Sequence, residues 1–240
     1  MLKYYLVKGG DVMGNKGSLE SSKGCSFLNY IFYFFMTNIF FLLVISPLLI
    51  YSFISGKNVS LPVLLIFSVL LGPAVATLCS VMLRVISGEH TTPNKDFFHF
   101  YRLNLIQGAV IAAILNSLIA VGYIDMSYFN SNGHQTLSYI FLAYIVLILA
   151  IGFFIYPLIG RYNLKIVHTF QMAIILFVKK PLISLISIVI IVTILGLIKL
   201  NSLVLVVVLL IPSIITYLIM KIEYNTIISL EQSIKEKYSK

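Results

Sequence analysis

The side chains that most often carry out catalysis are sparse in this 240-residue chain. Histidine, the usual general base near neutral pH, occurs four times without the spacing of a metal-binding HExxH pair, at His90, His99, His134 and His168. The sequence contains neither a GxSxG nucleophile elbow nor a GxxxxGKS/T phosphate-binding loop. We therefore expect no catalytic residue, no cofactor-binding residue and no metal site, and the sequence predicts a protein that is not an enzyme.

The amino-acid composition indicates the environment in which these residues lie. Apolar residues make up 60% of the chain and charged residues 10%, and the mean hydropathy is +1.01. An average soluble domain is about 45–50% apolar and about 25% charged. The apolar residues form continuous runs, and about 20 such residues cross the roughly 30 Å hydrocarbon layer as a helix. Continuous runs favour helices over the alternating strands of a barrel. The sequence thus predicts an all-α, polytopic transmembrane helix bundle in a lipid bilayer.

We predict about six membrane-spanning helices. Four apolar blocks stand alone, and the fifth, residues 182–222, is too long for one span and is interrupted by a polar stretch at 199–202. The predicted spans are residues 28–54, 61–86, 105–124, 137–159, 182–198 and 203–222. Residues 1–27 are predicted to form a polar, disordered tail, and residues 223–240 a basic tail. No cleavable signal peptide is expected, because the first block is longer than a signal h-region.

Basic residues fall almost entirely on one side of this topology. Of the 17 Lys and Arg, all but Lys57 and Lys199 lie in residues 1–27, 84–104, 161–181 or 221–240. The positive-inside rule makes that side cytoplasmic, so both termini are predicted to be cytoplasmic. The net charge of +9 is therefore interpreted as topology and attraction to anionic lipid, not as nucleic-acid binding. Cys25 and Cys79 are expected to be free thiols, because neither faces the outer compartment.

Two cytoplasmic segments are predicted to form short amphipathic helices in the membrane interface. The first follows a helix-start pattern at residues 92–96 and carries a cluster of aromatic residues, and the second occupies residues 164–180. Their aromatic and basic side chains either anchor the segments at the interface or form a docking surface for a partner. The candidate partner contacts are Phe97, Phe98, Tyr101, Arg102, Lys165 and Lys179.

The interiors of the predicted spans contain no Asp, Glu, Lys, Arg or His at their centres. Such residues usually mark proton relays and ion pathways, so a proton- or ion-coupled carrier lacks its usual groups here. Four prolines do fall inside spans, and each removes one backbone hydrogen bond. We predict helix kinks at Pro47, Pro73, Pro157 and Pro212. Such kinks either serve helix packing or open a central cavity.

Several short motifs, taken in order, resemble a known family. They are Asn38 followed by Pro47, Gly72-Pro73 leading to Leu83-Arg84, the aromatic and basic segment 98–105 that contains Asn104, and the segment 156–162 that begins Tyr-Pro. Over roughly residues 28–200 this arrangement resembles the YesL-type family of bacterial membrane proteins, grouped as domain of unknown function 624. The resemblance implies a location in the bacterial cell membrane.

The family resemblance also implies a role, since genes of this family often lie beside genes for carbohydrate uptake and degradation. One hypothesis is a non-enzymatic accessory component that associates with subunits of a sugar-uptake system through its cytoplasmic segments. The alternative is a small permease that itself moves a sugar or a similar small solute. The connection 161–181 lacks the Glu-Ala-Ala…Gly coupling segment of ATP-driven permeases, which favours the accessory hypothesis.

Overall fold

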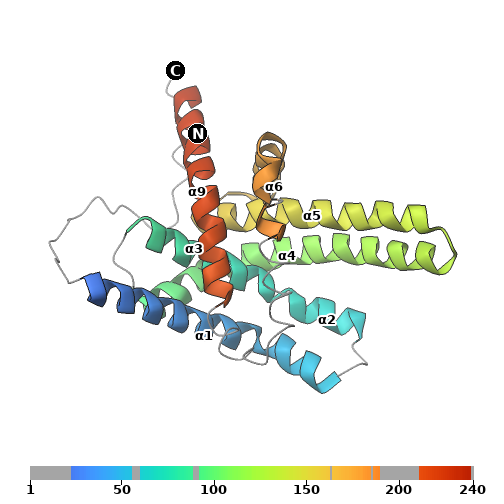
Figure 1. The fold of residues 1–240 in the computed structure, drawn as a ribbon, viewed down its shortest axis with the longest axis horizontal. Coiled ribbons are helices and arrows are strands. Elements are labelled where there is room, and N and C mark those ends of the chain that lie inside the picture. Colours follow the sequence, from blue (N-terminus) through green and yellow to red (C-terminus); the bar gives the residue numbers. More distant parts are fainter. Residues whose placement is uncertain are drawn as a thin grey trace.

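The computed structural model describes residues 23–55, 60–88, 92–162, 164–184, 186–189 and 211–238. All of their secondary-structure elements are α-helices, as predicted (Figure 1). In chain order they are α1 (Lys23–Ser55), α2 (Leu61–Ser68), α3 (Leu71–Ile86), α4 (Pro93–Ser131), α5 (Gln135–Arg161), α6 (Ile166–Lys179) and α9 (Ile211–Tyr238).

The described helices include several that are long and apolar enough to cross a membrane. Four segments qualify by themselves, and α6 forms a fifth with residues 181–189 if that pair, bent by 97°, is counted as one span. The four are Tyr30–Ser55, Pro62–Ile86, Pro93–Ser131 and Gln135–Arg161. The chain is therefore a multi-pass membrane protein. Residues 185, 190–198 and 203–210 of the predicted fifth and sixth spans, 182–198 and 203–222, lie outside the described residues.

The second span is interrupted between α2 and α3, at Val69 and Leu70. Proline has no backbone N–H, so Pro73 cannot donate to the carbonyl group of Val69. That carbonyl group instead accepts a hydrogen bond from the N–H of Gly72 at 3.2 Å. Helices α1 and α5 stay continuous through Pro47 and Pro157, and Pro212 lies in α9. Kinks at these three prolines remain a prediction.

Helices α4 and α5 lie antiparallel and side by side (Figure 1). Residues 125–131 continue α4, so the loop expected over residues 125–136 shrinks to the turn 132–134. Gly133 has a φ of +78° in this turn, a left-handed conformation that glycine adopts without steric cost. This short turn reverses the chain, so that α5 packs back against α4.

Helices α3 and α4 cross in close contact at Gly72 and Gly108. A Cβ atom on Gly108 would lie 2.7 Å from the Cα of Pro73, and one on Gly72 would collide with the carbonyl oxygen of Gly108. Close approach through small residues is a common way for membrane helices to gain packing contacts. Helix α9 packs on α3, on the side where α1 also lies (Figure 1).

The first predicted interfacial helix does not exist as a separate element. Helix α4 begins at Pro93, as the helix-start pattern predicted, and then runs unbroken for 39 residues. Phe97 and Phe100 turn inward and are buried, which holds this segment against the bundle. The second predicted amphipathic segment does contain a helix, α6, whose position relative to the membrane remains a prediction. The predicted tail from residue 223 onward continues α9 as far as Tyr238.

Candidate functional site

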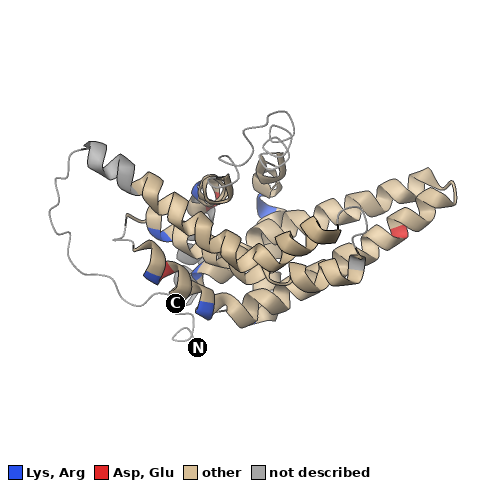
Figure 2. Ribbon diagram, turned by 90° about the horizontal axis from the view of Figure 1, so that it is seen from below, with Lys and Arg blue, Asp and Glu red and all other residues tan. Residues whose placement is uncertain are grey.

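Lysine and arginine side chains gather at one end of the bundle. The described Lys and Arg lie around the region where α3 ends, α4 begins and α5 ends, away from the turn between α4 and α5 (Figure 2). This concentration of basic residues at one end agrees with the excess of Lys and Arg on one side of membrane proteins. The candidate site consists of the Arg84–Asp96 ion pair near this end and of buried polar contacts between the helices.

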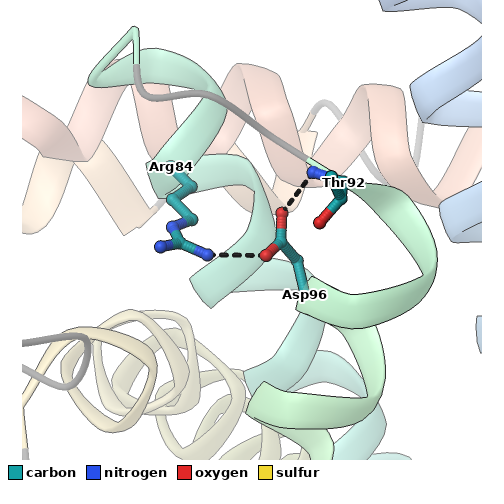
Figure 3. Close-up of polar contacts among 3 residues, drawn as sticks. All are labelled: Arg84, Thr92 and Asp96. Carbon is teal, nitrogen blue, oxygen red and sulfur yellow. Dashed lines mark hydrogen bonds and ion pairs between the residues drawn. The ribbon is translucent and has the colours of Figure 1, made fainter.

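An ion pair joins the end of α3 to the start of α4. Asp96 accepts a hydrogen bond from Nη1 of Arg84 at 2.6 Å and another from the backbone N–H of Thr92 at 2.7 Å (Figure 3). Arg84 lies in the last turn of α3 and Asp96 in the first turn of α4, so each charge also faces the favourable end of its helix dipole. The pair therefore fixes the entry of α4 relative to α3.

A second polar connection lies in the core between three helices. The Asn104 side-chain amide on α4 donates to Oγ of Ser80 on α3 at 3.0 Å. The same hydroxyl lies 2.9 Å from two acceptors, the carbonyl oxygens of Ala76 and of Gly160 on α5. Asn104 is fully buried, so leaving its amide unpaired would cost free energy. These bonds set the relative positions of α3, α4 and α5.

Two further side chains connect more distant segments. Asn38 on α1 accepts hydrogen bonds from the backbone N–H and the hydroxyl of Ser213 on α9, at 2.9 and 2.6 Å. Gln107 on α4 donates to the carbonyl oxygen of Leu164, between α5 and α6, at 2.8 Å. Together with the ion pair, these contacts place Asn38, Arg84 and Asn104, each from a different sequence motif, in interhelical bonds.

The predicted partner contacts separate into buried and exposed residues. Phe97 is completely buried and therefore cannot contact a partner on the surface of this fold, which corrects its place in the predicted set. Tyr101 is half-buried and stacks on Phe97, with ring centroids 6.3 Å apart. Phe98 is 43% exposed, and Arg102 is also exposed. Lys165 and Lys179 are exposed and lie at the two ends of α6.

The exposed residues at the start of α4 form one continuous stripe, which we call the α4 stripe. It consists of Lys95, Phe98, His99 and Arg102, all exposed. Their spacing of three, four and seven positions from Lys95 places them on one face of a helix. Phe98 and Arg102 were predicted as partner contacts from the sequence, and the structure adds Lys95 and His99 to the same exposed face.

The structure brings no metal-binding cluster together among the described side chains. No three His, Cys, Asp or Glu residues within the described ranges lie close enough to hold a metal ion. His168 contacts Gln171 at 3.1 Å on the exposed surface of α6, and the ring of His99 lies against Phe100. The described contacts hold helices in place and leave an exposed surface at the start of α4.

Comparison with known proteins gives one match. Residues 29–126 match the family model described as Protein of unknown function, DUF624. The resemblance inferred from the sequence motifs is confirmed by this match. The DUF624 segment extends from α1 into α4, and it includes Asn38, the Gly72–Gly108 crossing, the Arg84–Asp96 pair and Asn104. No curated protein and no solved structure matches the chain.

The burial of Glu223 was not predicted from the sequence. Glu223 was assigned to the C-terminal tail, but its side chain is completely buried in the interface of α9 with the bundle. Neither carboxylate oxygen has a hydrogen-bond partner among the described residues. Burial raises the pKa of the Glu223 carboxyl well above its usual range. The apolar neighbours Ile219 and Met220, one turn earlier on α9, are the signal that could have indicated its inward position.

Proposed function

We propose that this chain is a non-enzymatic accessory protein of the bacterial cell membrane, linked to carbohydrate uptake or utilisation. In this proposal its charged end and both termini face the cytoplasm. The α4 stripe, with the basic ends of α6, binds a subunit of a sugar-uptake system. The link to carbohydrates rests on the family resemblance, and the docking surface rests on the arrangement of exposed residues.

The observation that carries the proposal is the exposed α4 stripe on a rigid helical extension. Helix α4 has 39 residues, or about 58 Å at 1.5 Å each, which exceeds the roughly 30 Å hydrocarbon layer. Residues 103–124 contain no charged side chain and suffice to span that layer, so the α4 stripe lies beyond it. Aromatic and arginine side chains dominate binding hot spots, and the stripe presents both in Phe98 and Arg102.

Rigidity supports the same proposal. The Arg84–Asp96 ion pair and the burial of Phe97 hold the first turns of α4 in place. A preorganised surface binds with a smaller loss of conformational entropy than a mobile one. Lipid headgroups would also attract Lys95 and Arg102, at about 1 kcal/mol each, so the partner must be tested directly.

The alternative, a small permease, is supported by a different observation. Carriers coupled to protons or ions usually contain an ionisable side chain inside the helix bundle, and Glu223 is such a group. A coupled carrier was not expected from the sequence, because no ionisable side chain lies at the centre of any predicted span. The buried Glu223 therefore keeps the permease hypothesis open.

Affinity purification in mild detergent separates the two hypotheses. We expect a sugar-uptake subunit to co-purify with the wild-type chain, and Phe98→Ala with Arg102→Ala to reduce its recovery at an unchanged level of the chain itself. Ile114→Ala is the matched control, because Ile114 is an exposed apolar residue on the same helix within the charge-free section. Sugar uptake by the purified chain alone in liposomes, without a co-purifying partner, would establish the permease instead.

A further inference from the structure

Glu223 lies in an environment that does not suit a charged carboxylate. Its side chain is 0% exposed in the interface of α9 with the bundle, beside the core residues Met220 and Cys79. Its two oxygens accept no hydrogen bond from any described residue. An isolated ionised carboxylate in an apolar environment costs so much free energy that the group takes up a proton instead.

No described side chain donates a hydrogen bond to this carboxyl. The titratable or charged side chains in the core cluster that contains Met220, or in contact with a ring of that cluster, include Cys79 of α3, Tyr33 of α1, Tyr156 and Arg161 of α5, and Lys221 and Tyr224 of α9. Cys79 lies near Glu223 but forms no hydrogen bond with its carboxyl oxygens. Arg161 lies against the rings of Tyr162 and Tyr224, and Lys221 is exposed, with its amine 6.0 Å from the ring of Tyr217.

We propose that Glu223 is a proton-binding site that controls the docking of α9 on α3. The carboxyl holds a proton while α9 is packed, and loss of the proton releases this part of α9 from α3. Ser213, ten positions earlier and about 15 Å along the helix, stays bonded to Asn38 of α1. Release is therefore a hinge motion of α9 about its anchored end.

The direction of the pH dependence follows from the two states. In the packed state burial raises the pKa of Glu223 above its ordinary value, whereas in the released state the carboxyl is solvated and its pKa is ordinary. The packed state thus binds the proton more tightly. Packing of α9 is fully stabilised below the ordinary value of about 4.3 and weakens as the pH rises toward the raised value. Within that interval the equilibrium for release grows by up to about tenfold per pH unit.

The test uses the full chain in lipid vesicles, with wild type compared against Glu223→Gln, which keeps the shape of a protonated carboxyl. Infrared difference spectroscopy measures the carbonyl band of a protonated carboxylic acid. Hydrogen–deuterium exchange measures the opening of α9, and the ratio between the two proteins at each pH removes the intrinsic chemical rate. Asp125→Asn, a carboxyl-to-amide change at a partly exposed site on α4, is the matched control.

We expect a protonated-carboxyl band in wild type that Glu223→Gln lacks and Asp125→Asn retains. We also expect α9 of wild type to exchange progressively faster than α9 of Glu223→Gln as the pH rises. A missing band near neutral pH, or faster exchange in Glu223→Gln at every pH, would show a charged, paired carboxylate and overturn the proposal. If Glu223→Gln does not fold, Glu223→Met provides the neutral comparison, and the infrared band in wild type still decides the protonation state.

Discussion

Replacing Gly108 by alanine is expected to destabilise the bundle, because the backbone of α3 lies directly against α4 at this residue. The added Cβ would lie 2.7 Å from the Cα and 2.8 Å from the nitrogen of Pro73. Both neighbours are backbone atoms, so no side-chain rotation relieves the contact and the helices must separate. Overpacking of this kind costs about 1–3 kcal/mol, equivalent to about 2–12 °C in the unfolding midpoint of a chain this size.

Gly152→Ala on α5 is the matched control for this substitution. A Cβ there would meet only the Cδ1 of Leu115, at 3.8 Å, which is an ordinary van der Waals contact. Both substitutions bring the higher helix propensity of alanine, a gain of up to about 1 kcal/mol per residue. The difference between the two variants therefore isolates the effect of the α3–α4 crossing.

The assay is the fraction of monodisperse protein that remains after heating in detergent, measured by size-exclusion chromatography across a temperature series. We expect the midpoint of Gly108→Ala to fall below wild type and that of Gly152→Ala to equal or exceed it. Equal midpoints for the two variants would refute the reasoning, because they would mean that the crossing tolerates a side chain at Gly108.

Three further predictions follow from the same contacts and topology. Asp96→Asn should lower the stability by about 1.5–3 kcal/mol in the same heating assay, because it removes a charge-assisted bond, and an unchanged midpoint would argue against the ion pair. Asn104→Ala should cost about 0.6–2 kcal/mol, whereas a substitution at exposed Ser117 should have little effect; equal losses would contradict the Ser80 connection. In a chain without its native cysteines, a cysteine at Ser131 should react with an impermeant reagent in intact cells, and one at Lys165 only after permeabilisation. The opposite pattern would reverse the proposed orientation.

The regular parts of the fold were predictable because a membrane imposes a simple rule on each helix. The fourth predicted span, residues 137–159, lies within α5, whose bounds are Gln135–Arg161. The start of α4 was also predictable, because Pro93 and the acidic Asp96 are local helix-start signals. The helix was nevertheless divided wrongly near Arg102, because a charged residue ends a membrane span without ending the helix that contains it.

The missed features depend on contacts between residues far apart in the sequence. Nothing near Arg84 indicates that Asp96 of the next helix is its partner, and nothing near Gly72 indicates that Gly108 lies against it. Glu223 was assigned to a tail because a charge after an apolar run usually marks the membrane surface. Its burial arises from the packing of α9 on α3, which a hydropathy pattern along one helix does not encode.

Photo-crosslinking from the α4 stripe in living cells tests the proposed function most directly. A photoreactive phenylalanine analogue replaces Phe98 in one variant and Ile114 in the other, so that the same helix carries the probe beyond or within the charge-free section. We predict an adduct with a sugar-uptake subunit, identified by mass spectrometry, from position 98 and not from position 114. A normally produced chain that gives no protein adduct from position 98, or the same adducts from both positions, would contradict docking through the α4 stripe.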